Sequence, residues 1–531
     1  MEKYVKHPLI KDRKIQRRIY QETLLASCAN NNSLIILPTG LGKTIIAVLL
    51  SVYRLKKFPN SKIVFLAPTK PLVEQHYQTY KKVLTVKESL LTILTGSYSP
   101  EKRKSLWEKS KIIFITPQTL QNDLINNKVS ISSTSLMIFD EAHRAIGNYA
   151  YTFLANKYME VADNPLIAAL TASPGNEEKI KDVIENLFIE NIEIRDEKSK
   201  DVSPYIQDIK IERKFIDLPE EFKQIKLMIE KKLKYYLKEL KKYQFVITIN
   251  LKEINKKDLL TVQNRIQAKI KSGEKNTEIF ESVKNIAVAV KLSHMLELLE
   301  TQGLTSLNEY FKKMKAGRKK SDLVIVNDEQ MEKIEKIMQD LISKNIDHPK
   351  IEALKQTLTE QLHENEKSRI IVFIHYRVSA QKVVEVLTDL DKIYPIKFIG
   401  QQSKRGDKGL SQKEQISILQ KFRDGEYNVL VATSVAEEGL DISECDLVVF
   451  YDAVPSSVRA IQRRGRTGRK SPGKVIMLIA KGTRDEGYYW ASISKERKMK
   501  RMLQELQKIS VDIKDKKTKI SSKQTKIDKF F

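Results

Sequence analysis

Two doubly wound α/β domains with an all-α insertion between them are the fold that this 531-residue sequence predicts. The first observation is a series of short apolar runs between residues 33 and 175, separated by amphipathic segments. The second is the return of the same pattern between residues 369 and 480. The third is a long stretch between them in which apolar residues recur at helical spacing. Continuous apolar runs that alternate with helices are typical of buried parallel strands.

The first domain is expected over residues 1–218. Each of its strand candidates ends at Pro, Thr, Gly or an acidic residue, where a polar loop can follow. The candidates are LIIL (34–37), IVFLAP (63–68), IIFITP (112–117), LMIFDE (136–141) and LIAALTAS (166–173).

The insertion is expected over residues 219–345, which are rich in Lys, Glu, Leu and Ile and contain few strand-like runs. The second α/β domain is expected over residues 346–513. After about residue 513 the chain is Lys-rich and aperiodic, so residues 514–531 are predicted to be a disordered basic tail. The strand candidates of the second domain are RIIVFI (369–374), IKFIG (396–400), NVLVAT (428–433), LVVFYD (447–452) and KVIMLIA (474–480).

Composition narrows the class of protein. A net charge of +27 indicates a polyanionic partner, and nucleic acid is the main candidate, although a Lys-rich proteome is the simpler alternative. Only Cys28 and Cys445 are present, which fits a reducing compartment and excludes a zinc site built on cysteines. The sequence shows no export signal and no apolar run of membrane-spanning length, so we expect a cytoplasmic location without membrane contact.

A phosphate-binding loop follows the first strand. The segment LPTGLGKT comprises Leu37, Pro38, Thr39, Gly40, Leu41, Gly42, Lys43 and Thr44, and a helix is expected to begin at its end. Two glycines allow backbone N–H groups to surround phosphate oxygens, while Lys43 supplies positive charge and Thr44 offers a hydroxyl to Mg²⁺. The strict form of this pattern has Gly at its first position, where this chain has Leu37. We therefore predict an ATP site that uses Mg²⁺.

An acidic pair, Asp140 and Glu141, ends the strand in LMIFDEAH. A Mg²⁺–nucleotide site needs one carboxylate near the metal and a second that orients the attacking water. Asp140 suits the first role and Glu141 the second. The alternative, a solvated strand end without a catalytic role, is weak because a phosphate loop precedes the pair.

The second domain supplies basic side chains that could reach the ATP site. QRRGRTGR (462–469) places Arg466 and Arg469 three residues apart, so both face one way on a helical turn. Such a pair suits arginine fingers that stabilise charge on a transferring phosphoryl group. The alternative is a basic surface for nucleic-acid phosphates, which Arg463 and Arg464 fit equally well.

In their order along the chain, these motifs resemble those of superfamily 2 helicases and translocases. The match adds APTKPLVEQH (67–76), TPQT (116–119), TASPG (171–175) and TSVAEEGLD (433–441). Three further stretches resemble archaeal Hef helicases and the related Fanconi-anaemia M-type (Mph1-like) translocases, namely DEAHRAIGNYAY (140–151), FIGQQSKRGDKGLSQKEQ (398–415) and KGTRDEGYYW (481–490). The resemblance implies RecA-like motor domains, an insertion that grips the junction, and ATP-driven remodelling of forked or branched DNA.

The resemblance also implies roles for individual residues. Gln21 matches the adenine-reading glutamine, and Gly439 and Asp441 match ribose-side contacts. Thr171, Ser173 and Gln462 match positions that couple hydrolysis to movement. Contacts to the backbone of the tracked strand are implied for Thr69, Gly96, Thr116 and Thr433.

Two other functions remain open at this stage. A double-stranded-RNA translocase of the Dicer type shares QRRGRTGR-like motifs and a helical insertion. A nucleic-acid-binding scaffold with an inactive motor is disfavoured, because the ATP-site motifs are intact. The ERK at residues 496–498 resembles part of a nuclease motif, but no acid follows closely, so we predict no nuclease activity. A separate structure-specific nuclease is a candidate partner.

The last residues, KQTKIDKFF, place two aromatic residues on a polar tail. Gln524, Ile527, Phe530 and Phe531 have the spacing of the peptide box by which repair enzymes bind the sliding clamp (PCNA). A helical turn after the glutamine would gather the apolar side chains into a plug for a surface pocket. The disordered lead-in would then act as a tether.

Overall fold

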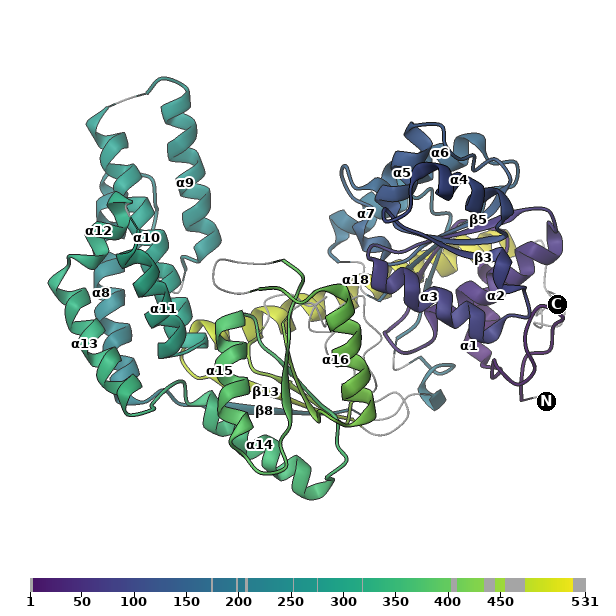
Figure 1. Ribbon diagram of the computed structural model, residues 1–531. Coiled ribbons are helices and arrows are strands. Elements are labelled where there is room, and N and C mark those ends of the chain that lie inside the picture. Colours follow the sequence, from purple (N-terminus) through teal and green to yellow (C-terminus); the bar gives the residue numbers. More distant parts are fainter. Residues whose placement is uncertain are drawn as a thin grey trace.

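The computed structural model describes residues 3–172, 175–196, 199–205, 209–251, 253–274, 276–317, 319–402, 408–433, 445–453 and 473–518. Two parallel sheets and a helical bundle make up these residues, which confirms the predicted fold class (Figure 1). None of the helices in the described ranges combines the length and the apolar composition that crossing a lipid bilayer requires.

The first sheet has seven strands in the order β3-β4-β2-β5-β6-β1-β7, and every pairing is parallel. Its strands are β1 (Ser33–Ile36), β2 (Lys62–Leu66), β3 (Leu91–Leu94), β4 (Ile112–Ile115), β5 (Thr134–Phe139), β6 (Ile167–Thr171) and β7 (Asn191–Ile194). The α-helices around it are α1 (Ile19–Cys28), α2 (Lys43–Lys57), α3 (Lys70–Val83), α4 (Pro100–Lys109), α5 (Pro117–Ile125), α6 (Ala150–Val161) and α7 (Glu177–Asn186). Short 3₁₀ turns lie at Glu88–Leu90, Ala142–Arg144 and Ser203–Tyr205.

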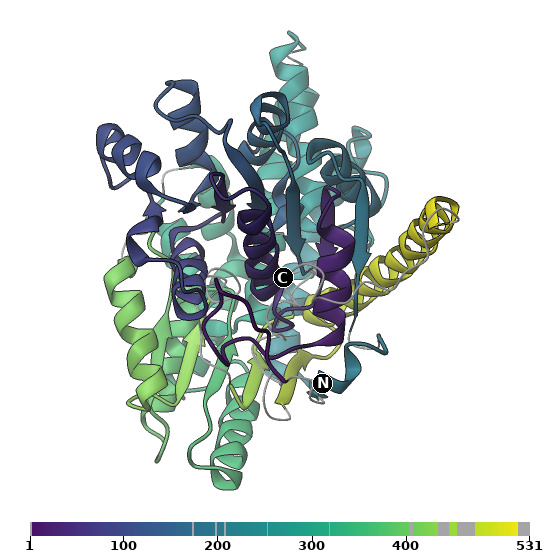
Figure 2. The same ribbon diagram turned by 90° about the vertical axis from the view of Figure 1, so that its right-hand side faces the viewer.

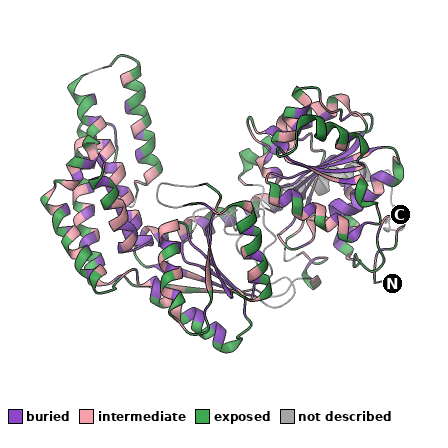
Figure 3. Ribbon diagram, viewed as in Figure 1, coloured by how far each residue is buried: buried purple, intermediate pink, exposed green. Residues whose placement is uncertain are grey.

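Alternate residues of the central strands enter different cores. In β1, Ile35 packs in the cluster on one face, whereas Leu34 and Ile36 pack in the cluster on the other. All four residues of this strand are buried, and Figure 3 shows the same burial along the strands of both sheets. Helices covering both faces explain why these strands are continuous apolar runs.

The second sheet has six strands in the order β10-β11-β9-β12-β13-β8, again with parallel pairings only. Its strands are β8 (Ile209–Ile216), β9 (Ile370–Phe373), β10 (Pro395–Phe398), β11 (Val429–Ala432), β12 (Leu447–Phe450) and β13 (Gly473–Ala480). Its helices are α14 (Lys350–Glu364), α15 (Arg377–Thr388), α16 (Gln412–Asp424) and α18 (Arg484–Thr518).

Two boundaries expected from the sequence differ from the structure. β8 was expected in the first domain, which we placed at residues 1–218, but it pairs with β13 along its whole length. It precedes the insertion in the sequence and lacks a local signal for either sheet, so only tertiary pairing assigns it. α18 continues to Thr518, which is beyond residue 513, where a disordered tail was expected to begin.

The insertion is a bundle of α8 (Glu220–Lys242), α9 (Lys256–Lys271), α10 (Thr277–Thr301), α11 (Leu304–Lys315), α12 (Lys320–Val326) and α13 (Glu329–Ser343). Polar caps begin several of these helices, and Asn255 and Asp258 form a reciprocal capping box at α9. The bundle sits on the second domain through buried polar contacts. Gln302 donates to Asp452 Oδ1 at 2.6 Å and accepts from the Ser379 hydroxyl at 2.6 Å. Buried charge-assisted contacts of this kind fix one docking geometry.

α18 links the two sheets. It contacts β13 of the second sheet, β7 of the first sheet and α10 of the insertion. Figure 1 shows it passing from the second domain toward the first, and Figure 2 shows it in yellow at the side of the first domain.

Candidate functional site

The phosphate loop lies between β1 and α2. Gly40 and Gly42 adopt positive φ angles of 88° and 77°, which L side chains rarely tolerate. A Cβ atom at Gly42 would also lie 2.7 Å from Nε2 of Gln21, so the Gln21 side chain would have to shift to admit it. Lys43 donates to the carbonyl oxygens of Leu37 at 2.8 Å and Pro38 at 3.3 Å. The loop therefore presents glycine backbone and one ammonium group, which fits polyphosphate.

Gln21, the expected adenine reader, lies beside this loop. It is buried on α1, and its amide donates to the Tyr20 hydroxyl at 3.4 Å. That hydroxyl in turn donates to the carbonyl of Leu41 at 2.8 Å. Arg18 lies over the ring of Tyr205, at 5.3 Å from the centroid, and Tyr205 packs edge-on against Tyr20. The structure thus joins the glutamine to the phosphate loop and to the segment that leads toward β8.

Asp140 follows β5, which is separated from β1 only by β6 in the sheet. Its Oδ2 lies 2.8 Å from Nε2 of His76, and Nδ1 of the same imidazole lies 3.3 Å from the Thr44 hydroxyl. Burial raises the pKa of the Asp140 carboxyl. The interaction with His76 and the charge of Lys43 outweigh burial and hold that pKa below its usual value. The expected Mg²⁺ ligands, Thr44 and Asp140, therefore meet through one histidine.

Glu141 adopts a left-handed backbone conformation, with φ at 49°, where the chain turns away from β5. Its Oε2 lies 3.3 Å from Nδ1 of His143. The geometry of that contact is not that of a hydrogen bond, and the buried oxygen has no hydrogen-bond partner among the described residues. An unsatisfied buried carboxylate oxygen is costly in a folded protein. It suits a water molecule that arrives with substrate.

The threonine and glycine residues expected to contact a nucleic-acid strand follow adjacent strands. Thr69 follows β2, Gly96 follows β3 and Thr116 follows β4, and these strands are neighbours in the order β3-β4-β2. The carboxyl ends of parallel strands share one sheet edge, so all three loops lie at the same edge as the phosphate loop. Thr433 follows β11 and lies at the corresponding edge of the second sheet.

Several expected site residues lie outside the described residues. They are Ser173, Gly439, Asp441, Gln462, Arg463, Arg464, Arg466, Arg469, Gln524, Ile527, Phe530 and Phe531. The roles assigned to them remain predictions.

His76 ends the motif APTKPLVEQH, but the motif alone assigns no role to this residue. His76 lies on α3, seven residues after Thr69, which places both on the same face of the helix. A titratable residue at the end of a motif was the available signal. Its contact with Asp140 is a tertiary feature, so only the structure reveals it.

Family comparisons cover most of the chain. Residues 9–176 match the family described as type III restriction enzyme, res subunit. Residues 221–346 match the helical bundle of a putative ATP-dependent RNA helicase, and residues 349–471 match the helicase conserved C-terminal domain.

Individual proteins are similar over longer spans. A putative ATP-dependent RNA helicase of Methanocaldococcus jannaschii is 42% identical over 504 residues, which cover 95% of this chain and 63% of that protein. The ATP-dependent DNA helicase mph1 of Neurospora crassa is 34% identical over 488 residues, covering 89% of this chain and 41% of that protein. This chain therefore spans less than two thirds of the length of either relative.

One solved structure is similar over its whole length. The crystal structure of the Pyrococcus furiosus Hef helicase domain has a TM-score of 0.71 and 46% sequence identity. The match covers 91% of this chain and 100% of that one.

Proposed function

The chain belongs to the Hef-type helicases of superfamily 2, as its motifs indicated, and from this premise we propose that it is an ATP-dependent DNA helicase or translocase that remodels branched DNA. One observation carries the proposal. The phosphate loop, the acidic pair and three of the four expected strand-contact loops all leave the same edge of the first sheet. A conformational change caused by ATP hydrolysis at one half of that edge can therefore move a nucleic-acid strand that is bound at the other half.

The ATP site has groups for each task that hydrolysis requires. On nucleotide binding, Lys43 would exchange its hydrogen bonds to the carbonyls of Leu37 and Pro38 for contacts to phosphate oxygens. The glycine loop would donate backbone N–H groups to the same phosphates. Thr44 and Asp140 would hold Mg²⁺, which when bound neutralises phosphate charge. Glu141 would orient the attacking water through its unsatisfied oxygen. Arg466 and Arg469 are proposed to complete the site from the second domain.

Branched DNA is the proposed substrate because the related mph1 protein is described as a DNA helicase and the Pyrococcus domain as Hef. The net charge of +27 favours a polyanionic substrate, whether it is DNA or RNA. The Methanocaldococcus relative is described as an RNA helicase, so duplex RNA remains the second candidate.

The deciding experiment compares ATP hydrolysis with forked DNA, a Holliday junction, plain duplex DNA and duplex RNA, at one salt concentration. We expect the largest stimulation with fork or junction DNA and strand displacement on the same substrates. Stronger stimulation by duplex RNA would replace the proposed substrate.

Lys43→Ala tests the motor itself. We expect it to abolish hydrolysis while DNA binding remains, because strand contacts come from other loops. Undiminished hydrolysis would reject the ATP-site assignment. If the unsubstituted chain bound DNA without any hydrolysis, the inactive scaffold would be the correct description.

We also propose that Gln524, Ile527, Phe530 and Phe531 bind the sliding clamp. Replacing both phenylalanines by alanine should abolish retention on immobilised clamp and leave hydrolysis unchanged. Unchanged retention of the double variant on the clamp would contradict the proposed clamp-binding role of these four residues. A partner nuclease is a further proposal, which co-purification with an active fork-cleaving activity would test.

A further inference from the structure

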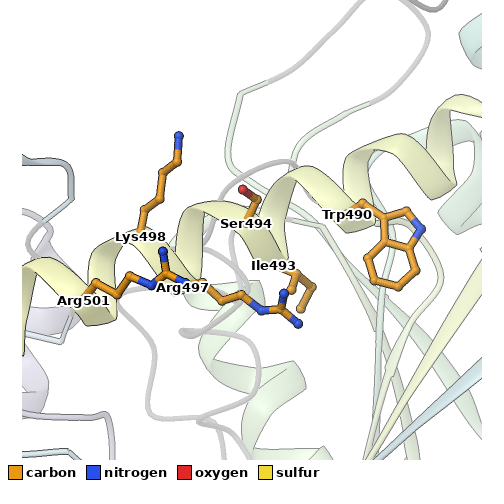
Figure 4. Close-up of a pocket in the computed structure, with 6 residues that line it drawn as sticks. All are labelled: Trp490, Ile493, Ser494, Arg497, Lys498 and Arg501. Atoms are coloured by element: carbon orange, nitrogen blue, oxygen red, sulfur yellow. The ribbon is translucent and has the colours of Figure 1, made fainter.

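One side of α18 carries an exposed aromatic ring followed by basic residues. Trp490, Ile493, Arg497 and Arg501 recur at intervals of three and four residues, which places them along one stripe of the helix. A pocket of about 350 Å³ lies against this stripe. It is lined by Trp490, Ile493, Ser494, Arg497, Lys498 and Arg501 (Figure 4).

The indole of Trp490 is held in place but remains accessible. Its ring packs edge-on against Tyr489, with centroids 4.9 Å apart, and its N–H donates to Glu486 at 3.3 Å. Tyr489 is buried and accepts a hydrogen bond from Arg213 of β8. Trp490 is nevertheless 51% exposed, whereas Trp107, the other tryptophan, is 3% exposed. A rigid aromatic face open to solvent is a stacking surface.

The basic residues that line this pocket have no ion-pair partner within the part of the chain that the structure describes. Arg497, Lys498 and Arg501 make no ion pair among the described residues. Residues 490–501 contain five basic residues and one acidic residue, Glu496. In Figure 4 the guanidinium group of Arg497 lies beside Ile493, on the side of the helix that carries the indole, whereas Lys498 points the other way. The stripe thus combines an aromatic face with guanidinium groups that no described residue neutralises.

We propose that this stripe is a second contact site for single-stranded DNA, in which one unpaired base stacks on Trp490 and backbone phosphates bind Arg497 and Arg501. At a rise of 1.5 Å per residue, the two arginines are about 6 Å apart along the axis, and the indole lies about 10 Å before Arg497. A strand whose base occupies the indole can therefore reach both arginines with its following phosphates. This proposal rests on the proposed function.

The position of the stripe agrees with such a strand. α18 begins four residues after β13 ends, at the edge of the second sheet where Thr433 also lies. From that edge it runs toward the first domain, whose β7 it contacts (Figure 1). An acidic protein segment would satisfy the arginines but leave the aromatic face unused, so nucleic acid is the better match to the whole surface.

Tryptophan fluorescence tests the site directly, because Trp107 is buried and donates to the Ser130 carbonyl at 3.0 Å. A short oligodeoxythymidine should quench the emission of the full chain, and Trp490→Phe should remove that response. Trp490→Ala should weaken oligonucleotide binding about 5- to 50-fold, within the range of one stacked base. Trp490→Phe should retain most of the affinity, since it keeps an aromatic face.

The double variant R497Q/R501Q tests the phosphate contacts. The slope of log affinity against log salt should fall by about 1.4, because each contact to a single strand contributes about 0.7. Lys413→Gln, an exposed lysine on α16, is the matched control and should leave wild-type affinity for the oligonucleotide.

The outcomes separate this proposal from the proposed function. Unchanged emission at saturating oligonucleotide, or wild-type affinity in Trp490→Ala, would overturn the proposal that the stripe binds single-stranded DNA. This conclusion would hold even if DNA still stimulates ATP hydrolysis. Stronger quenching by polyglutamate than by oligonucleotide would also overturn it. Quenching without any DNA-stimulated ATP hydrolysis would support DNA binding by the stripe and would reject the proposed function as an ATP-driven motor.

Discussion

The hydroxyl of Thr171 lies 3.2 Å from Nδ1 of His143, where β6 ends at the edge of the first sheet. The carbonyl oxygen of Thr171 also accepts the backbone N–H of Leu37 at 3.1 Å. One buried residue thus contacts both the phosphate loop and the turn that follows the acidic pair. This arrangement gives a physical route for the coupling role that the motif implies.

Thr171→Val should uncouple movement from hydrolysis. The substitution keeps the shape and the backbone contact to Leu37 but removes the hydroxyl that faces His143. We expect strand displacement to fall at least tenfold, while DNA-stimulated ATP hydrolysis falls only a few-fold. Both activities should be measured on the same fork substrate.

Thr134→Val is the matched control. Thr134 is buried in the same sheet, and its hydroxyl has no hydrogen-bond partner among the described residues. Removing an unsatisfied hydroxyl should leave both activities unchanged and raise stability slightly. Equal losses of hydrolysis and displacement in Thr171→Val would show that the residue is only structural.

Glu141→Gln should abolish turnover without abolishing nucleotide binding. The amide keeps the size of the side chain but cannot accept a proton from water as the carboxylate can. We expect kcat to fall about 100-fold or more, as for loss of a general base. The affinity for a fluorescent ATP analogue should stay within a few-fold of the wild-type value. A kcat within tenfold of wild type would exclude Glu141 as the water-orienting group.

The central strands of both sheets could be predicted because burial on both faces makes them continuous apolar runs. Of the four edge strands, only β10 was predicted, as IKFIG (396–400), whereas β3, β7 and β8 were not. β3 reads LTIL and β7 reads NIEI, and each has residues that are only partly buried. A strand covered by fewer neighbours can keep polar residues, so it loses the signal that identifies the interior strands.

The candidate site divides in the same way. Lys43, Asp140 and Thr171 lie at or just beyond the carboxyl ends of predicted strands, so the parallel topology alone brings them to one edge. His76 and the docking contact between Gln302 and Asp452 join segments far apart in the sequence. No local pattern encodes such pairs, so the structure was needed to find them.

His348 should make the fold acid-sensitive. Its Nε2 contacts the Glu300 carbonyl at 3.0 Å, and its Nδ1 accepts the Lys350 backbone N–H at 3.2 Å, so both contacts suit the neutral imidazole. Burial, together with the charge of Lys350, lowers the pKa of His348 to about 3 from its ordinary 6.5. Between these values the unfolded chain binds a proton that the folded chain does not, so stability falls as the pH falls.

We expect His348 to lower the free energy of unfolding by about 1.4 kcal/mol for each pH unit below pH 6.5. His348→Gln removes the titrating group, so the difference in the free energy of unfolding between wild type and variant should shrink as the pH falls from about 7.5 to about 5.5. Urea unfolding at several pH values measures this difference. Parallel pH profiles for the two proteins would contradict the assignment.

Arg103 should position the loop that carries Gly96. Its guanidinium donates to Asp123 through Nε at 2.7 Å and through Nη2 at 2.5 Å, and Nη1 donates to the carbonyl of Tyr98. Asp123 is 2% exposed on α5, which begins directly after Thr116. The pair therefore braces two of the loops expected to contact the strand.

Asp123→Asn should destabilise the first domain by about 3–5 kcal/mol, because it leaves a buried guanidinium group without its counter-charge. The double variant R103M/D123L removes both charges and should recover most of the melting temperature, but it cannot restore the contact to Tyr98. If the pair positions the loops, the double variant should need several-fold more forked DNA for half-maximal stimulation of hydrolysis, while basal hydrolysis stays unchanged. A stable double variant with wild-type DNA dependence would limit Arg103 and Asp123 to a structural role.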